Sequence, residues 1–371
     1  MNANLVFGLI ICIILELSLC KKADYFPSFL SMFSKIEKKA KLLSLSDIDL
    51  PLGGGHFQGI KLFSDYPKSE TGFLLISHDS STLPFVMISK YNHTSHSLCC
   101  AEYAILASDG REPPLRHIGG IDLITETSKR TGQTYGILAA GLEDNQDKLR
   151  SEVRFYKMDS NRNEYNENAE ISIEEIEKLR IYREGEETKR FTAGAAAIVK
   201  VHEDNPYYLA AVLDWDAENV DFYWTGYCDD FTQCEHFQFI ATWNHKDKLT
   251  QQEQSNASWG SYQNFNMFYG RDESDGRDKV FILTTLTSYS IFDYAHLFAL
   301  QINKGPGQLQ DGQLWDIDIH KKDSKKINMK NGAHFIYAGG FFTKQFSELI
   351  TLGTQRNPED GVLQIYVSQY P

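Results

Sequence analysis

Histidine, carboxylate and tryptophan side chains occupy two recurring kinds of position in this chain, and together they could bind a polar molecule. His56 and His117 begin short apolar runs. The others lie at or just after the ends of such runs and are His78, Asp79, Glu143, Asp214 and Trp215. Imidazole and carboxylate groups hydrogen-bond to hydroxyls, and an indole offers a flat apolar face. We therefore predict that these seven residues bind a ligand, provided that the fold brings the two kinds of position together.

A block that recurs five times, at a spacing of roughly 60 to 77 residues, indicates such a fold. Each block opens with small residues or a histidine, at 55–60, 116–121, 192–198, 262–267 and 333–340. A second apolar run, a third run rich in aromatic and aliphatic residues and a shorter, more polar fourth run follow. A repeat of this length, built of short strands, is typical of a β-propeller.

The last block has only three expected strands before the sequence stops, and an earlier segment can supply the fourth. Residues 42–50 alternate in part between apolar and polar side chains, as a strand does. Pairing this strand with the last block closes the ring and leaves no free sheet edge. We therefore predict an all-β fold, a five-bladed β-propeller of four-stranded blades over 42–371 as a single domain. A six-bladed ring with an irregular blade in 160–190 is the alternative.

The order of strands within a blade predicts where the polar residues gather. The second strand runs antiparallel to the first, so the start of the first strand and the end of the second lie at the same end of the ring. The inner strands also contain small residues, at Gly59, Gly119, Gly120, Gly194 and Gly339. These either keep a central funnel free of side chains or allow inner strands to crowd around the axis.

The repeat count and strand pattern of about residues 42–371 resemble those of five-bladed β-propellers as a class. Neither the Gly-His and Trp-Asp pattern of WD40 repeats nor the kelch Gly-Gly signature recurs in all five blocks, so neither points to one family. Known five-bladed propellers include secreted sugar-binding lectins, arabinan-degrading glycosidases and nucleotide-hydrolysing apyrases. The resemblance implies these functions only by analogy, because one fold hosts many functions.

Three functions fit the polar end of the ring. The first is a binding module for a polar ligand such as a glycan, with Trp215 as an aromatic platform. The second is a secreted glycosidase-like hydrolase that uses two of Asp79, Glu143 and Asp214, which would have to converge to about 5–10 Å. The third is a protein-interaction scaffold that uses its outer loops. The starts of the inner strands carry no carboxylate, unlike those of the glycosidases that the chain resembles, and this favours binding.

A metal ion in the central channel is the one cofactor that the sequence suggests. His56, His78, His117 and Asp79 offer donors for a transition metal, and the three carboxylates would suit calcium. No motif with metal-ligand spacing, such as His-Glu-x-x-His, supports such a site. The acidic segment 272–278 contains Asp275-Gly276 and predicts a hairpin turn rather than a calcium loop.

The N-terminus predicts export from the cell. Residues 5–15 are an uncharged apolar run, too short to span a bilayer. We interpret 1–20 as a signal peptide and 21–41 as a linker or short helix. The segment 17–20 also resembles a bacterial lipobox, and a lipoprotein anchored through Cys20 is the alternative to a secreted protein. No transmembrane span is expected in the mature chain.

Cysteines, sequons and net charge agree with an extracellular location. Cys228 and Cys234 are expected to form a disulfide across a hairpin, whereas Cys99 and Cys100 are either a vicinal disulfide or two free thiols buried on a strand. Asn92 and Asn256 begin glycosylation sequons. The net charge of −13 argues against nucleic acids and anionic membranes as partners. The expected partner is an extracellular polar ligand, a glycan or a protein.

Overall fold

The structure is a computed structural model of the full chain, and it is almost entirely β-sheet. The described residues are 25–26, 28–46, 54–64, 70–80, 84–95, 97–106, 115–128, 131–144, 150–160, 171–184, 192–202, 205–215, 217–249, 259–260, 262–288, 292–305, 313–329, 334–344, 348–357, 359 and 361–368. The segment 1–20 with Cys20, and the sequon at Asn256, lie outside these residues. No helix in the described part of the chain is long and apolar enough to cross a membrane.

The strands form consecutive antiparallel runs that follow the sequence repeats. One run comprises β3 (Phe57–Phe63), β4 (Thr71–His78), β5 (Phe85–Asn92) and β6 (Ser97–Ile105). Another comprises β7 (His117–Thr127), β8 (Thr134–Glu143) and β9 (Arg150–Ser160), and the outer edge of β9 pairs with both β10 (Ile171–Glu175) and β11 (Ile181–Glu184). The segment 171–175 is therefore an edge strand. A 3-10 turn, η1 (Glu177–Leu179), connects β10 to β11.

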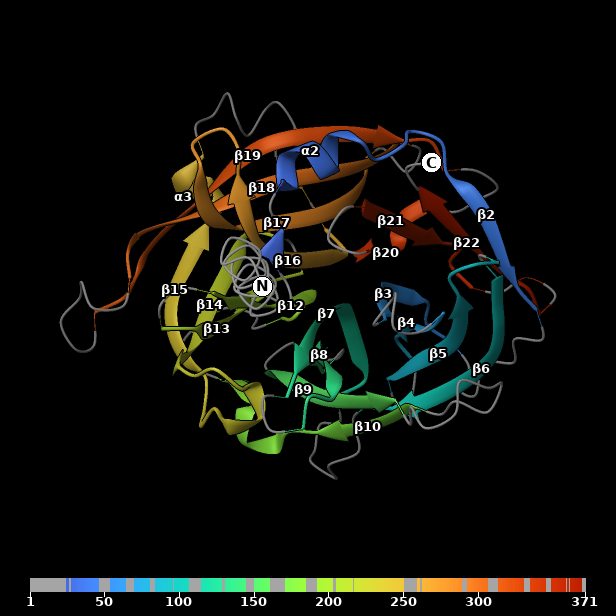
Figure 1. Ribbon diagram of the computed structural model, residues 1–371, viewed down its shortest axis with the longest axis horizontal. Coiled ribbons are helices and arrows are strands. Elements are labelled where there is room, and N and C mark those ends of the chain that lie inside the picture. Colours follow the sequence, from blue (N-terminus) through green and yellow to red (C-terminus); the bar gives the residue numbers. More distant parts are fainter. Residues whose placement is uncertain are drawn as a thin grey trace, which may run out of the picture.

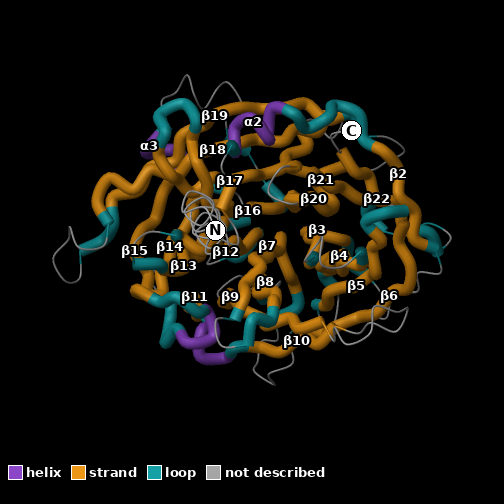
Figure 2. The backbone as a smooth tube through the Cα atoms, viewed as in Figure 1, coloured by secondary structure: helices purple, strands orange, loops and turns teal. Residues whose placement is uncertain are grey.

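The remaining strands repeat this order. They are β12 (Ala195–Val201), β13 (Tyr207–Leu213), β14 (Asn219–Tyr227) and β15 (Gln238–Asn244), then β16 (Asn264–Asp272), β17 (Arg277–Ser288), β18 (Phe292–Lys304) and β19 (Asp316–Ile327), then β20 (His334–Lys344), β21 (Glu348–Thr354) and β22 (Leu363–Ser368). Two single turns, η2 (Phe231–Gln233) and α3 (His245–Lys248), flank β15. Strands thus dominate the chain (Figure 2).

The runs are arranged as a ring, with the first strand of each run near the centre (Figure 1). Neighbouring inner strands touch in parallel at small residues, where Gly120 of β7 pairs with Ala195 of β12 and Gly339 of β20 pairs with Gly59 of β3. Apolar side chains fill the space between adjacent runs, so strands such as β8 and β13 are buried along their whole length. This is a β-propeller, the architecture that the repeat predicts.

An N-terminal strand completes the last run, as predicted. β2 (Lys41–Leu45) pairs antiparallel with β22, with Leu43 opposite Ile365. The strand ends at Leu45, whereas the sequence pattern extended it to 50, and 47–50 lie outside the described residues. The pairing covers the outer edge of β22, which would otherwise expose unpaired backbone groups.

The segment before β2 also contributes to the core. β1 (Tyr25–Phe26) pairs in parallel with β16, and α2 (Phe29–Ser34) follows it. Phe29 is fully buried and stacks on Phe281 at 4.6 Å between ring centroids. Glu273 accepts a hydrogen bond from the Ser28 hydroxyl at 2.5 Å and so holds the start of the helix. Part of the expected 21–41 linker is therefore packed structure, and the short-helix interpretation applies to it.

The cysteines follow the sequence expectation in one case and depart from it in the other. Cys228 and Cys234 form the predicted disulfide. Cys99 and Cys100 are free thiols, but both are exposed rather than buried. The reason is a β-bulge in β6, since Ala101 pairs with Ser89 and Cys99 with Lys90, which leaves Cys100 between them with φ of 59°.

The acidic segment after β16 is a hairpin turn, as expected. The Gly276 amide donates to the Asp272 carbonyl at 2.8 Å, and Gly276 has φ of 69°, which glycine adopts without strain. The Asp272 side chain accepts from Ser274 N and from the ammonium groups of Lys279 and Lys322. Those donors hold its pKa below the usual range although burial opposes them.

The ring axis is closed by backbone and by buried polar side chains. A Cβ added at Gly120 would lie 2.4 Å from the Gln263 carbonyl oxygen, and one at Gly340 would lie 1.9 Å from that of Ile60. The small residues therefore serve close packing of the inner strands, and they do not keep an open channel. At this level Lys61 of β3 forms an ion pair with Asp122 of β7 at 2.7 Å, and both side chains are at most 3% exposed.

Candidate functional site

The register places the two kinds of sequence position beside each other at one end of the ring. His117 at the start of β7 pairs with Glu143 at the end of β8. Phe57, next to His56, pairs in the same way with His78. Antiparallel pairing of the first two strands in a run thus gathers polar residues as the sequence suggests, although the side chains then point in different directions.

His117 and Glu143 form the most buried polar pair at this end. The Nδ1 atom of His117 lies 3.0 Å from Glu143 Oε1, with 3% and 0% of the two side chains exposed. The other carboxylate oxygen, Oε2, accepts a hydrogen bond from the Ala193 amide at 2.7 Å. Neither His117 Nδ1 nor Glu143 Oε1 makes a hydrogen bond to the described residues, so the two groups form a close buried pair without one.

Gln58 connects this pair to the second histidine. Its Nε2 atom lies 3.1 Å from His117 Nε2 and 3.5 Å from His56 Nε2. The Gln58 side chain is buried, and its carbonyl oxygen Oε1 has no hydrogen-bond partner among the described residues. A buried carbonyl without a partner costs about 1–3 kcal/mol.

Trp215 supplies an aromatic surface next to the imidazole. Its ring centroid lies 5.1 Å from that of His117, and the residue is half-buried. Its backbone amide donates to the Thr192 hydroxyl at 2.8 Å, which fixes the loop after β13 against the start of β12. An imidazole, an amide and an indole are therefore held together by elements of three different runs.

His56 and Asp79 form a half-exposed edge of the same end. Asp79 Oδ1 accepts a hydrogen bond from the His56 backbone amide, and His56 Nδ1 lies 2.9 Å from the Phe57 carbonyl oxygen. Gly55 lies so close to Asp79 that a Cβ there would be 2.0 Å from the Asp79 carbonyl oxygen. His56 Nε2 is the atom of this edge that points toward Gln58.

Two of the predicted ligand-binding residues have structural partners instead. Asp214 accepts hydrogen bonds from the Glu218 amide at 2.7 Å and the Asn219 amide at 3.0 Å, so it orders the loop between β13 and β14. The His78 ring is fully buried and stacks on Phe85 at 4.7 Å. Burial lowers the pKa of His78, and the site keeps the imidazole neutral.

These positions do not assemble a metal centre. The described residues contain no group of three or more His, Cys, Asp or Glu side chains that could hold a metal ion. The His78 ring stacks on Phe85, and its Nε2 atom lies 3.3 Å from Asn357 Oδ1. Glu143 and Asp214 each accept hydrogen bonds from backbone amides of their own surroundings.

Sequence reasoning missed Gln58 as a site residue. It stands inside the first repeat block, two residues after His56, where the same face of a strand recurs. The block at 116–121 has Gly119 at the corresponding position, so comparison of the repeat blocks does not single out Gln58. Side chains of a strand alternate between its two faces, and counting by two from His56 could have identified Gln58.

Comparisons with known proteins give only distant structural similarity. No protein-family model and no curated protein sequence matches the chain. Among solved structures, the chain is similar to a β-fructofuranosidase from Schwanniomyces occidentalis complexed with fructosyl-erythritol, with 8% identity, a TM-score of 0.46, and coverage of 89% of this chain and 58% of that one. An exo-β-1,3-galactanase from Phanerochaete chrysosporium with β-1,3-galactotriose has 7% identity, a TM-score of 0.42, and coverage of 88% and 64%. The chain spans less than two thirds of the length of each, and so distant a likeness assigns no site residue.

Proposed function

We propose that the chain is an extracellular five-bladed β-propeller that binds a polar ligand of the glycan class at the axial end formed by His56, Gln58, His117 and Trp215. Each antiparallel run counts as one blade in this proposal, and β2 completes the last. The disulfide between Cys228 and Cys234 supports an oxidising compartment.

The observation that carries the binding proposal is the contact between Trp215 and His117 beside the unpartnered Gln58 carbonyl. A pyranose ring presents an apolar C–H face and several hydroxyls. The indole can cover that face, while Gln58 Oε1 and the imidazoles accept or donate hydrogen bonds. Asp79 at the half-exposed edge adds a further acceptor.

Hydrolysis at the same end is the second candidate, and one observation favours it. A buried Glu143 beside His117 Nδ1 is also the arrangement that orients a histidine as a general base. The structural neighbours named above are enzymes that act on fructosides and a galactan, which makes glycans the first substrates to assay. In this version His117, rather than a pair of carboxylates, would activate the attacking water.

Replacing Trp215 with Ala should weaken glycan binding about 30-fold, because a buried aromatic anchor contributes about 2 kcal/mol. The measurement is a glycan array followed by titration of the best ligand with wild-type protein and Trp215→Ala. Tyr227→Ala is the matched control, since Tyr227 is a 55% exposed aromatic at the far end of β14.

The same titration separates the proposed functions. Equal affinity of Trp215→Ala and wild type would overturn binding at the axial end and favour a scaffold that uses outer loops. Release of reducing sugar that is lost in His117→Ala would establish the hydrolase instead. Circular dichroism of each variant checks that the fold is intact.

A further inference from the structure

Two lysine-rich segments lie far apart in the sequence and side by side in the structure. Residues 35–41 lead from α2 into β2, and residues 321–326 belong to the C-terminal half of β19. Each segment holds four lysines, which are Lys35, Lys38, Lys39 and Lys41 in the first and Lys321, Lys322, Lys325 and Lys326 in the second. We call the two segments together the lysine row.

Backbone contacts hold the two segments together at the rim of the ring. The amide of Asn328, just after β19, donates to the Lys38 carbonyl at 2.6 Å, and Lys39 pairs with Asn328 in a parallel bridge. Lys325 Nζ donates to the Ser34 carbonyl at the end of α2, at 2.6 Å. Figure 1 shows α2 beside β19, with the chain that leaves it running along the rim to β2. The lysines therefore belong to one surface.

Most of the positive charge on this surface has no carboxylate partner. Five of the eight lysines are exposed and form no ion pair with a described residue, namely Lys38, Lys39, Lys41, Lys321 and Lys326. Lys322 differs, since it pairs with Asp272 at 3.0 Å. Burial lowers the pKa of Lys325, Asp323 opposes this effect, and the Lys38 ammonium lowers the pKa further. The two segments thus repel each other electrostatically where they meet.

The lysine row reverses the charge of the protein locally. Its two segments hold eight lysines against two carboxylates, those of Glu37 and Asp323, whereas the whole chain has a net charge of −13. The nearby acidic hairpin after β16 does not cancel this excess. Three of its carboxylates are already paired with cations of the same hairpin, in the pairs Asp272–Lys279, Asp275–Lys279 and Asp278–Arg271. A concentration of one sign of charge attracts a partner of the opposite sign.

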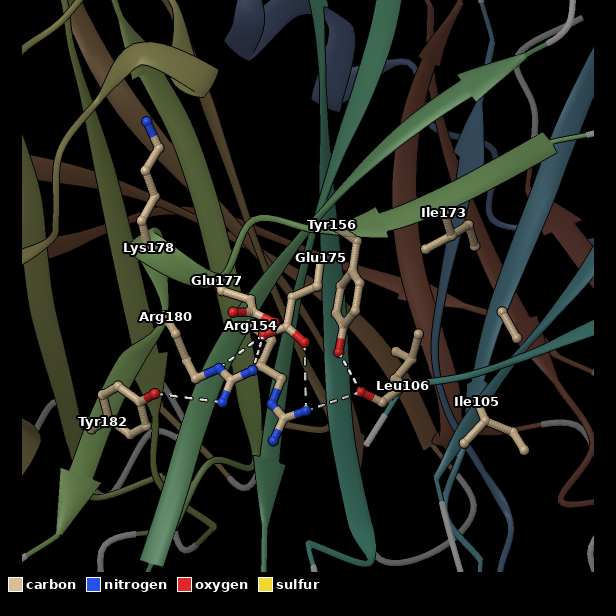
Figure 3. Close-up of a pocket in the computed structure, with 11 residues that line it drawn as sticks. Ile105, Leu106, Arg154, Tyr156, Ile173, Glu175, Glu177, Lys178, Arg180 and Tyr182 are labelled. Atoms are coloured by element: carbon tan, nitrogen blue, oxygen red, sulfur yellow. Dashed lines mark hydrogen bonds and ion pairs between the residues drawn. The ribbon is translucent and has the colours of Figure 1, made fainter. Parts of the chain in front are cut away.

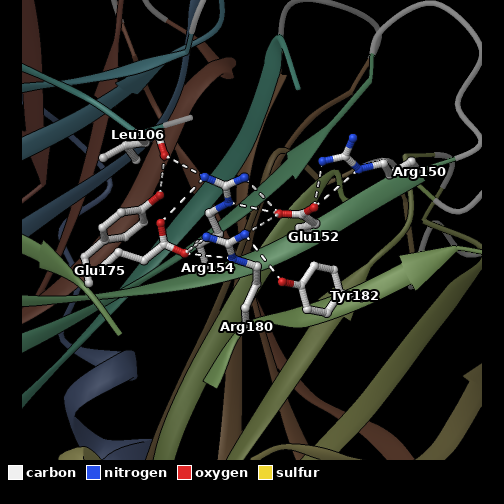
Figure 4. A network of polar contacts seen from close by, with 8 residues as sticks. Leu106, Arg150, Glu152, Arg154, Glu175, Arg180 and Tyr182 are labelled. Carbon is white, nitrogen blue, oxygen red and sulfur yellow. Dashed lines mark hydrogen bonds and ion pairs between the residues drawn. The ribbon is translucent and has the colours of Figure 1, made fainter. Parts of the chain in front are cut away.

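The arginines beside the cavity that β6 and β10 line are a contrasting case. Arg154 and Arg180 border this cavity (Figure 3). Arg180 Nε donates to Glu175 Oε1 at 2.8 Å, and Arg154 forms an ion pair with Glu152 at 2.9 Å (Figure 4). These cations have carboxylate partners within the chain, so they do not require an anion from outside.

We propose that the lysine row binds a sulfated polysaccharide. Lysine-rich segments of this length are typical of surfaces that bind heparin or nucleic acids. A strand rises about 3.3 Å per residue, so Lys321 and Lys326 lie on the order of 15 Å apart along β19, and residues 38–41 extend the row. An extended chain that carries many sulfates matches this linear arrangement. The surface shares no residue with the axial end.

Three observations favour a polysaccharide over a nucleic acid or a lipid bilayer. The disulfide of Cys228 and Cys234 supports an extracellular location. The ring of Phe292, beside the row, is covered by the Lys326 ammonium at 3.9 Å from its centroid, so it is not open to stack on a base. The apolar side chains of Phe33 and Ile36 next to the row are buried, so they are not available to a bilayer.

The test is surface plasmon resonance on an immobilised heparin oligosaccharide, with the same oligosaccharide after desulfation as the reference. Wild-type protein should bind only the sulfated form. Its affinity should fall about tenfold or more between about 50 and 200 mM salt, because each lysine contact releases counterions. The triple variant Lys38→Gln, Lys39→Gln, Lys326→Gln should bind about 30-fold more weakly than wild type at the lower salt concentration.

A charge-matched triple variant is the control. Lys90→Gln, Lys157→Gln and Lys178→Gln remove the same charge from β5, β9 and η1, on the other side of the ring from β19 (Figure 1). Its affinity for heparin should stay within about twofold of wild type, since these lysines lie more than a Debye length from the row. Changing the three row lysines to arginine keeps the charge and should keep the binding. Melting temperatures show whether each variant is folded.

Four results would overturn the proposal. Heparin could bind the glutamine variant of the row as tightly as wild type. The desulfated oligosaccharide could bind as well as the sulfated one. Duplex DNA or phosphatidylserine vesicles could bind wild type more tightly than heparin does, and the 45% exposed Leu42 beside Lys41 makes vesicles a necessary arm. Trp215→Ala could abolish heparin binding while the glutamine variant of the row retains it, which would place this ligand at the axial end.

Discussion

Changing Lys61 to Met should lower the free energy of unfolding by about 3–5 kcal/mol, because it leaves the buried charge of Asp122 without its partner. Burial alone raises the pKa of Asp122 and lowers that of Lys61, and each partner opposes the effect on the other. Removing either one exposes the full cost of burying the other.

The effect is expected to be large because this pair connects the inner strands of all the runs. Asp122 Oδ2 accepts from the Ile198 amide of β12 at 3.1 Å and the Met267 amide of β16 at 3.0 Å. Lys61 donates to the Phe341 carbonyl of β20 at 2.9 Å. The two side chains of β3 and β7 therefore bind backbone groups from three other inner strands.

A double-mutant cycle of Lys61→Met and Asp122→Asn measures the coupling. Urea denaturation should give a double variant whose loss of stability is smaller than the sum of the single losses by about 2–3 kcal/mol. Lys246→Met is the control, because the pair of Lys246 with Glu218 is exposed and should matter by less than about 1 kcal/mol. Additive losses at Lys61 and Asp122 would show that the pair is not coupled.

The outline of the fold could be predicted from the sequence because it depends on local signals. Apolar and polar residues that alternate with a period of two, in segments that recur along the chain, predict the antiparallel strands. The same alternation at Leu42 to Leu45 predicts the closing strand. The disulfide of Cys228 and Cys234 followed from their short separation between two strands. In each case the partner lies in a neighbouring strand, or it is the one strand that the last repeat block lacks.

The ion pair of Lys61 and Asp122 at the ring axis could not be predicted in the same way. Lys61 and Asp122 are 61 positions apart in the sequence, and only the geometry of the ring brings their side chains together. The ion pair of Glu175 and Arg180 could not be predicted for a related reason. Glu175 and Arg180 belong to a stretch rich in Glu and Lys that is typical of a solvated edge, and pairing of β10 with β9 turns them toward Arg154.

Acid should destabilise the protein through His296, and His296→Gln should remove much of that sensitivity. Burial, with a smaller effect from the ammonium group of Lys321, lowers the pKa of His296 from 6.5 to about 3. The Tyr262 hydroxyl lies 2.8 Å from Nδ1 and can donate to it, and the rings of Tyr294 and Phe298 also contact the imidazole. The folded protein thus accommodates the neutral form and resists protonation.

The sign of the effect follows from proton binding in the two states. Below about pH 6.5 the unfolded chain takes up a proton on this histidine, whereas the folded protein does not until about pH 3. Stability from this group is therefore complete above pH 6.5 and falls as the pH decreases toward 3. Between pH 7 and pH 4.5 the loss amounts to about 2–3 kcal/mol.

Urea denaturation of wild type and His296→Gln at pH 7 and pH 4.5 measures this loss. Glutamine retains an acceptor for the Tyr262 hydroxyl and does not titrate, so the variant should lose about 2–3 kcal/mol less than wild type on acidification. Some loss should persist, because burial also lowers the pKa of His78. His320→Gln, a change at an exposed histidine of β19, should behave as wild type does. Equal losses in wild type and His296→Gln would mean that the imidazole is already protonated in the folded protein, and that Tyr262 is not donating to it.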